Sequence, residues 1–154
     1  MAPAVILYDG VCGFCDRTVR FVLQRDHDAR FRFAPLQSAY AEDVLARHGR
    51  DAQDLDTVSL VLDPDGPTER ILVKSDAACA IFDRLGGVWR FAALARWIPR
   101  GLRDAAYDAF ASRRYRWFGR FDECPIPSPE LRARLAVAAA SPQRRLCGGD
   151  VAAP

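Results

Sequence analysis

The chain begins with a short apolar run that passes directly into a helical pattern, and this junction constrains the fold most. Residues 4–8 are apolar or aromatic, and Asp9-Gly10 ends the run with a pair typical of turns. Such a run predicts a central strand buried on both faces. From Cys12 onward, the apolar positions follow one face of a helix, at Cys15, Val19, Val22 and Leu23. The sequence therefore predicts a buried strand that leads through one turn into an amphipathic helix.

Three further strands and two further helices are predicted before residue 88. Residues 31–34 alternate and stop at Pro35, and residues 57–62 are rich in branched side chains, so both are predicted strands. A turn signal at residues 63–66 predicts that residues 71–73 pair back onto 57–62 as a hairpin. The helices are predicted to start at two capping serines, Ser38 for a helix to about His48 before Gly49, and Ser75 for a helix closed by Gly86-Gly87.

The predicted order of these elements is β-α-β-α-β-β-α. Two parallel strands joined through a helix, then a hairpin and a helix, form the topology of the thioredoxin fold, and right-handed crossovers leave few competing arrangements. We therefore predict an α/β, thioredoxin-like fold with a C-terminal helical extension. The expected core is 1–87, the extension 88–140 packs on it within the same domain, and 141–154 form a flexible tail.

The predicted extension is rich in aromatic and arginine residues. One helix is predicted from Trp89, Phe91, Leu94, Trp97 and Ile98, and it is broken at Pro99-Arg100-Gly101. A second runs from Leu102 to Ala111 and into residues 113–119. Residues 124–127 are extended because each proline disfavours helix in the residue before it. Ser128 is the predicted cap of a last short helix with Pro129 as its first residue.

The composition limits the cellular compartment and the classes of binding partner that we expect for this chain. A net charge of +2 is too small to argue for nucleic acid. No segment approaches the ~20 apolar residues that span a bilayer, and the first residues lack the basic start of a signal peptide. A reducing, cytoplasmic setting is therefore expected, in which paired cysteines are typical of catalysis or metal binding. Five cysteines is an odd number, which argues against a closed disulfide framework.

Cys12 and Cys15 are the candidate catalytic pair. Two-residue spacing at a helix N-terminus lets the sulfurs reach bonding distance, and the helix dipole favours a thiolate at the first position. We expect Cys12 to lie exposed at the cap and attack as the nucleophile, while Cys15 lies on the buried side and resolves the mixed disulfide. Gly13 and Phe14 are candidate substrate-binding residues, and Gly13 imposes little steric cost on a docking backbone. The substrate is a protein or small-molecule thiol or disulfide, and no cofactor is expected.

Asp9 has two interpretations, which the sequence leaves open. It either turns the chain out of the strand, or it is a partly buried carboxylate that accepts the proton of Cys15 during resolution. A carboxylate beside a thiolate would also raise the pKa of that thiol. Elsewhere, Cys79 is expected in the core and Cys124 is expected as a packed thiol, with a second redox role as its alternative. Arg113, Arg114 and Arg116 are expected on a solvated face, with anion binding as the alternative.

Three other interpretations compete with redox chemistry. The cysteine pair could be half of a zinc site, but Cys124 and Cys147 are far apart and His27 and His48 form no second ligand pair. The pair could also be inert core thiols. Finally, the chain could be a non-catalytic adaptor whose aromatic and arginine residues 88–120 dock a partner or a membrane surface, which requires those residues to be exposed.

The residues Tyr8-Asp9-Gly10-x-Cys12-x-x-Cys15 resemble the Asp-x-x-Cys-x-x-Cys signature of the DCC family of predicted thiol–disulfide oxidoreductases. The resemblance continues through residues 33–38, Ser75-Asp76-Ala77, residues 85–87 and the Arg114-Tyr115…Gly119…Cys124 stretch, in order over about a hundred residues. It implies a thioredoxin-like fold and a dithiol site at Cys12 and Cys15. The resemblance predicts more about the fold and the site than about the substrate.

Val58 marks a departure from ordinary thioredoxins, which usually have a cis-proline at the comparable position beside the active cysteine. A cis bond before a non-proline residue costs about 2.5–4 kcal/mol, so we predict a trans bond here. The substrate groove around Val58 should then differ, which favours a narrow substrate or a dedicated protein partner.

Overall fold

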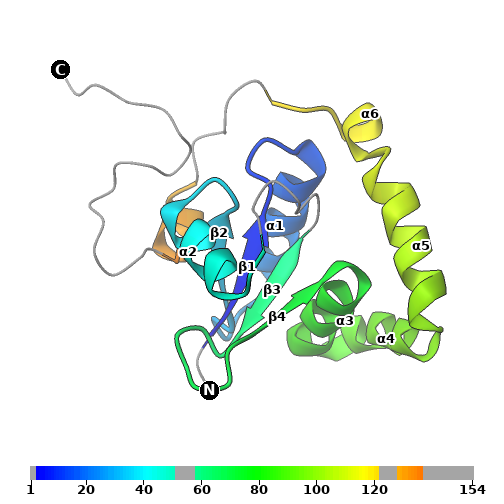
Figure 1. The fold of residues 1–154 in the computed structure, drawn as a ribbon, viewed down its shortest axis with the longest axis horizontal. Coiled ribbons are helices and arrows are strands. Elements are labelled where there is room, and N and C mark those ends of the chain that lie inside the picture. Colours follow the sequence, from blue (N-terminus) through cyan, green and yellow to red (C-terminus); the bar gives the residue numbers. More distant parts are fainter. Residues whose placement is uncertain (1–2, 51–57, 122–127, 137–154) are drawn as a thin grey trace.

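The computed structural model describes residues 3–50, 58–121 and 128–136, and a four-stranded mixed sheet lies at its centre (Figure 1). The strands are β1 (Ala4–Tyr8), β2 (Phe31–Pro35), β3 (Ser59–Leu62) and β4 (Arg70–Val73), in the spatial order β2-β1-β3-β4. β1 pairs in parallel with β2 and antiparallel with β3, and β3 pairs antiparallel with β4. The predicted α/β class is confirmed, and the topology is compatible with a thioredoxin-like fold.

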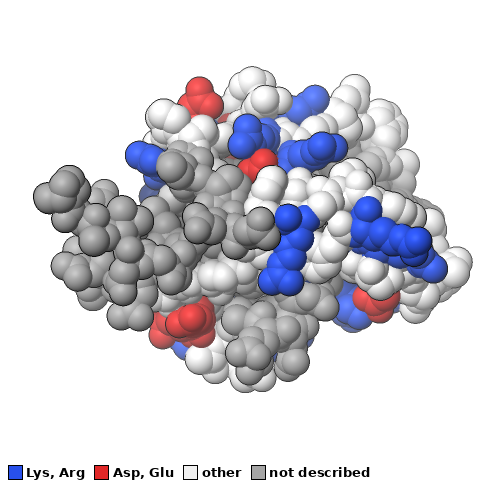
Figure 2. Space-filling model, turned by 90° about the horizontal axis from the view of Figure 1, so that it is seen from above, with Lys and Arg blue, Asp and Glu red and all other residues white. Residues whose placement is uncertain are grey.

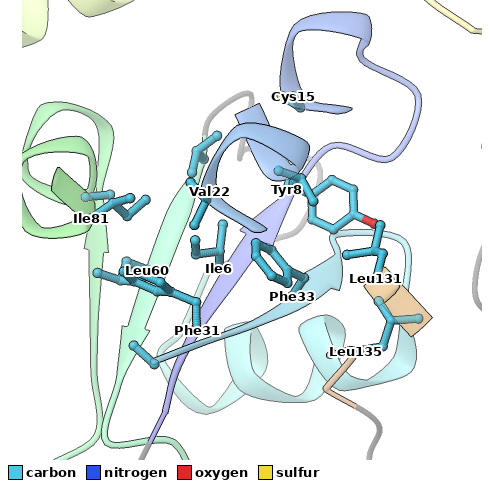
Figure 3. Close-up of a cluster of buried hydrophobic side chains, with 14 of the residues drawn as sticks. Ile6, Tyr8, Cys15, Val22, Phe31, Phe33, Leu60, Ile81, Leu131 and Leu135 are labelled. Carbon is cyan, nitrogen blue, oxygen red and sulfur yellow. The ribbon is translucent and has the colours of Figure 1, made fainter. Parts of the chain in front are cut away.

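Three helices cover the two faces of this sheet, namely α1 (Gly13–Arg25), α2 (Ala39–Arg47) and α3 (Lys74–Leu85). Alternation along β1 divides the core, because successive side chains point to opposite faces. Ile6 and Tyr8 join Phe31 and Phe33 under α1 and α3, as Figure 3 shows, and Val5 and Leu7 join the side chains of α2 on the other face. All five residues of β1 are buried, as predicted for a central strand.

Two predicted helix caps are confirmed and one is wrong. Ser38 accepts a hydrogen bond from the Ala41 N–H, and Ser128 accepts one from the Leu131 N–H with Pro129 as the first helical residue. Ser75 is not a cap, because α3 already begins at Lys74. The Ser75 hydroxyl instead donates to the carboxylate of Asp104, a charged acceptor in a distant helix.

The extension is a series of short helical elements. It consists of η1 (Gly87–Trp89), α4 (Arg90–Ala93), η2 (Leu94–Trp97), α5 (Arg100–Ala111), α6 (Arg114–Phe118) and α7 (Pro129–Ala133). The first helix predicted here is thus three short turns of alternating α and 3₁₀ type. None of the helices in the described residues is long and apolar enough to cross a membrane.

The extension returns the chain to the start of α1. α4 and α5 contact α3, and α6 contacts α1 at the other end of α5 (Figure 1). Residues after α7 also pair with the edge strand β2, where the Phe33 N–H donates to Arg134 O (3.0 Å) and the Ala136 N–H donates to Phe33 O (2.8 Å). Residues 137–140 of the predicted extension and the predicted tail 141–154 lie outside the described residues.

Candidate dithiol site

The two cysteines lie at the N-terminus of α1, where the sequence predicts them. Cys12 is the N-cap residue, with an extended backbone at φ −90° and ψ 118°, and Cys15 lies in the first helical turn. A turn between β1 and α1 fixes Cys12, because its N–H donates to Asp9 O (3.3 Å) and its carbonyl accepts from the Asp16 N–H (3.0 Å). The Cys12 side chain therefore lies at the positive end of the α1 helix dipole.

The environment shifts the two thiols in opposite directions. A hydrogen bond from the Cys15 thiol lowers the pKa of Cys12 from 9.0 to about 6, against the effect of burial, and the N–H groups of Cys15 and Phe14 add to the shift. The same hydrogen bond, together with burial, raises the pKa of Cys15 well above its ordinary value. The site therefore favours a thiolate at Cys12 and a neutral thiol at Cys15.

The prediction that Cys12 lies exposed at the cap is wrong, because its exposed fraction is 0%. Residues Gly119–Phe121, which we call the covering segment, lie across the start of α1. The Gly13 N–H donates to Gly119 O (3.3 Å), and the Phe121 N–H donates to Val11 O (2.8 Å). Cys12 and Arg120 form the isolated β-bridge between the two segments. This cover comes from more than a hundred residues later in the chain, so no local pattern at Cys12 predicts it.

Gly13 and Phe14, the candidate substrate-binding residues between the cysteines, contact the extension. A Cβ atom at Gly13 would overlap the carbonyl oxygen of Phe118. The Phe14 ring lies against those of Phe110 and Phe118, with ring centres 4.8 and 5.1 Å away. Glycine at position 13 thus accommodates the protein's own backbone at the place where a substrate backbone was expected.

Val58, the third candidate substrate-binding residue, is nearly buried in the core beside β3. Its N–H donates to the hydroxyl of Tyr107 in α5 (3.3 Å). Burial raises the pKa of Tyr107 to about 12, so this hydroxyl keeps its proton at physiological pH. The peptide bond before Val58 joins it to Thr57, so the predicted trans bond lies outside the described residues.

The buried carboxylate of Asp9 joins three segments that are far apart in the sequence. Asp9 Oδ1 accepts hydrogen bonds from the Val11 N–H (3.1 Å) and from Gln37 Nε2 (3.1 Å). Asp9 Oδ2 accepts one from the Tyr115 hydroxyl and lies 3.6 Å from Nη2 of Arg114. The hydrogen bond between Asp9 and Cys15 involves the Asp9 backbone and lowers the pKa of Cys15. Whether the carboxylate also receives the Cys15 proton remains a prediction.

Arg114 is buried, with an exposed fraction of 3%, so the expected solvated face is wrong for this residue. Arg113 and Arg116 are exposed. Arg114 Nη2 donates to the Tyr115 hydroxyl (2.8 Å), and its positive charge lowers the pKa of both cysteines. Burial, and then the hydrogen bond donated to Asp9, raise the pKa of Tyr115 to about 12. Arg114 thus supplies a buried positive charge next to the dithiol.

Sequence reasoning missed Gln37 and Tyr115 as site residues. The signal that could have found them is their place in the motif segments that resemble the DCC family, since both contact the Asp of the Asp-x-x-Cys-x-x-Cys signature. Arg114 stands in the same motif, but its charge pattern alone resembles that of its exposed neighbours. Such polar residues can be recognised as site residues only when the structure shows that they contact the same carboxylate.

The described residues contain no group of three or more His, Cys, Asp or Glu side chains that could hold a metal ion. Cys79 is half-buried in α3, where Arg103 Nη1 lies 3.3 Å from its sulfur. Cys124 and Cys147, and with them the expected extended segment 124–127, lie outside the described residues.

Comparisons with known proteins place this site in a family. A family model described as DCC1-like thiol-disulfide oxidoreductase matches residues 6–120, a span that holds both cysteines and every partner of Asp9 named above. The chain belongs to this family. It is 38% identical over 131 residues to the uncharacterized protein YuxK of Bacillus subtilis, covering 85% of this chain and 92% of that protein.

A second relative is a chloroplastic DCC family protein of Arabidopsis thaliana, 33% identical over 123 residues, with 79% of this chain and 69% of that protein covered. No solved structure matches the chain significantly. The family supports a redox role for the dithiol, and the resemblance noted from the signature is confirmed.

Proposed function

We propose that this protein is a thiol–disulfide oxidoreductase in which Cys12 attacks and Cys15 resolves. The observation that carries the proposal is the opposite shift of the two thiols at one helix N-terminus, which makes Cys12 the better nucleophile at neutral pH. The proposed substrate is a protein or a small molecule that carries a thiol or a disulfide. The dithiol itself is the redox group, so the proposal needs no cofactor.

In the reducing direction, the Cys12 thiolate attacks one sulfur of the substrate disulfide. The substrate S–S bond breaks, one substrate thiolate leaves, and Cys12 forms a mixed disulfide with the other half. Cys15 then loses its proton and attacks the Cys12 sulfur, which forms the Cys12–Cys15 disulfide and releases the second substrate thiolate. Two electrons pass from the dithiol to the substrate, and a thiol donor returns them in the reverse of these steps.

Cys15 needs a proton acceptor in the second step, because its pKa is raised. We assign this role to Asp9, whose carboxylate lies at the same turn and is held by Val11 and Gln37. Tyr115 connects the Asp9 carboxylate to Arg114. The opening of the mixed disulfide would then depend on the charge balance of this buried group of residues.

Substrate access requires a movement, because Cys12 has no exposed surface. Two backbone hydrogen bonds, Gly13 to Gly119 and Phe121 to Val11, hold the covering segment over the sulfur. Hydrogen bonds of this kind contribute about 0.5–1.5 kcal/mol each, so their opening is a small cost. An extended substrate backbone that took the place of the covering segment could form the same two bonds.

Arg114 is proposed as a positioning residue that acts through charge. Replacing it in Arg114→Gln should raise the pH midpoint of Cys12 alkylation, because the thiolate loses a nearby positive charge. Arg116→Gln is the matched control, since Arg116 is exposed on the same helix. If Arg114 served packing alone, the pH midpoint of Cys12 alkylation in Arg114→Gln would equal the wild-type value, and this result would contradict the assignment.

The direct test of the redox function is mild oxidation followed by alkylation under denaturing conditions and mass measurement. The reduced chain has five thiols, and the oxidised wild type should take up two alkyl groups fewer. Cys12→Ser and Cys15→Ser should each keep all of their remaining thiols, whereas the control Cys79→Ser should still lose a pair. A wild type that loses no pair, or a Cys12→Ser protein that still loses one, would contradict the proposal.

We propose a reducing, cytoplasmic setting for this cycle, because a redox-active pair rather than a structural disulfide is typical of that compartment. The non-catalytic adaptor remains the second candidate. It is favoured by the exposure of several apolar residues between 88 and 98, although other aromatic residues of the extension pack inward. Docking through residues 88–98 uses a different part of the molecule from the dithiol, so docking by itself is compatible with redox activity.

A further inference from the structure

A line of large apolar side chains runs along the outer face of residues 88–97. Val88, Phe91, Leu94 and Trp97 have exposed fractions of 71%, 73%, 54% and 81%. They recur every three residues through η1, α4 and η2, and 3₁₀ turns bring such positions into line. We call this line the 88–97 stripe. Its exposure is a property of the fold and not of a disordered end, because the same residues form continuous helical turns.

The inner face of the same segment is already packed. Trp89 lies edge-on to Phe21 with ring centres 4.8 Å apart and stacks near Phe82 at 6.4 Å, and Ala93 is buried. The outer stripe is therefore not needed to attach this segment to α3. Ile98 and Leu102 continue the exposed apolar surface toward α5. Contiguous apolar patches of this kind mark sites that meet another surface.

Arginines outnumber acidic residues around the stripe, by five to two over residues 83–104. Between Asp83 and Asp104 the sequence has five arginines and no acidic residue. Arg90 and Arg100 are 69% and 65% exposed, and their surface ion pairs with Asp83 (3.5 Å) and Asp76 (3.0 Å) contribute little stability, so lipid phosphates can replace these carboxylates. Figure 2 shows the molecule from the α6 end of α5, where basic side chains also outnumber acidic ones.

We propose that the 88–97 stripe docks this protein on an anionic lipid surface. Trp, Phe and Leu flanked by arginine are typical of helices that lie in the membrane interface, and arginine binds phosphate groups through two hydrogen bonds. A second copy of the chain is disfavoured as the occupant, because a symmetric contact would bring the same arginines against each other. α4 also lies at an outer corner of the fold, a shape suited to insertion between headgroups (Figure 1).

Docking at this corner keeps the lipid surface away from the covering segment and the dithiol. α4 and α6 lie at opposite ends of α5, and α6 is the element that contacts α1 (Figure 1). A helix with the 12 residues of α5 is about 18 Å long. The proposal is thus independent of the redox function, and each can fail without the other.

The test is flotation of the purified protein with vesicles of phosphatidylcholine alone and of phosphatidylcholine mixed with phosphatidylglycerol in equal parts. Wild type should float with the mixed vesicles only, and added salt should weaken its binding. The variant Phe91→Ser/Trp97→Ser should bind on the order of tenfold more weakly, and Arg96→Gln about fivefold more weakly. Trp117→Ser is the matched control, because Trp117 is exposed on α6 outside the stripe and should not affect binding.

Three results would overturn the proposal. The first is a wild type that floats with neither vesicle, and the second is a double variant that floats as wild type does. The third is concentration-dependent self-association of wild type without vesicles that the double variant abolishes, which would assign the stripe to a second copy of the chain. Thermal unfolding and thiol counting on the same variants verify that the fold and the dithiol are intact.

Discussion

The parts of the helical extension around α6 and around α4 are similar in composition, but their key side chains are buried at α6 and exposed at α4. At the α6 end, Arg114 and Tyr115 turn inward onto Asp9, and the covering segment closes over Cys12. At the α4 end, Phe91 and Trp97 turn outward and meet no other part of the described chain that buries them. The difference is that the α6 end meets a buried carboxylate and free backbone groups at the start of α1, whereas the α4 end is held by its inner face alone.

This comparison shows that the content of aromatic residues and arginine does not by itself determine whether the side chains of a segment are buried or exposed. A buried arginine needs a counter-charge and hydrogen bonds, and Asp9 and Tyr115 provide them for Arg114. Without such partners, arginine stays exposed beside apolar side chains. Substitutions of the inward-facing residues at the α6 end should therefore change stability and the dithiol, and substitutions in the stripe should change neither.

The largest expected effect is that of Asp9→Ala. It removes the counter-charge of buried Arg114 together with the hydrogen bonds from Tyr115 and Gln37, and should lower the free energy of unfolding by about 3 kcal/mol. Asp43→Ala is the control, because the side chain of Asp43 is 64% exposed and pairs with Arg47 at the surface, so its loss should cost below about 0.5 kcal/mol. Urea unfolding measures both. Equal losses for the two variants would show that the Asp9 cluster stabilises no more than a surface pair.

Gly13→Ala comes next. Its Cβ atom would overlap the Phe118 carbonyl, so the covering segment must shift, with an expected cost of about 2 kcal/mol and faster alkylation of Cys12. Gly101→Ala meets no atom in α5 and should stabilise the protein by about 0.5–1 kcal/mol. Urea unfolding and alkylation rates measure the two effects. If Gly13→Ala left both unchanged, the close contact between α1 and residue 118 would be refuted.

The smallest effect is expected in the stripe itself. Trp97→Ser should change the free energy of unfolding by less than about 0.5 kcal/mol, because the side chain is exposed. Trp89→Ser, eight positions earlier on the packed face, should cost at least about 2 kcal/mol through lost contacts with Phe21. Thermal or urea unfolding of the pair distinguishes the faces. A large loss for Trp97→Ser would mean that the outer face is packed after all.

The sequence predicts those parts of the fold that local physics determines. The buried run of β1, the Ser38 cap and the Pro129 start of α7 depend on residues within four positions, and all three are confirmed. The position of Cys12 and Cys15 at a helix start follows in the same way from the turn at Asp9 and the apolar period after it.

The rest depends on contacts between distant segments, which no local rule contains. Ser75 is a residue type that favours helix caps, yet its hydroxyl donates a hydrogen bond to Asp104 of another helix. Cys12 has the position of an exposed nucleophile, yet the covering segment buries it. Arg114 differs from Arg116 only in what the fold brings beside it. These three cases share one cause, which is that the extension folds back on the core, onto α3 at Ser75 and onto the start of α1 at Cys12 and Asp9.

The most direct test of the redox account is the pH dependence of alkylation at each cysteine of the folded wild type, followed by peptide mapping. The lowered pKa of Cys12 means that its thiolate fraction falls only as the pH drops through about 6, so its labelling rate should already be level between pH 7 and 9. Cys15, with its raised pKa, should remain unlabelled across that range. Labelling of Cys15 before Cys12, or a Cys12 rate that still rises tenfold per pH unit up to about pH 9, would contradict the proposed roles of the two cysteines.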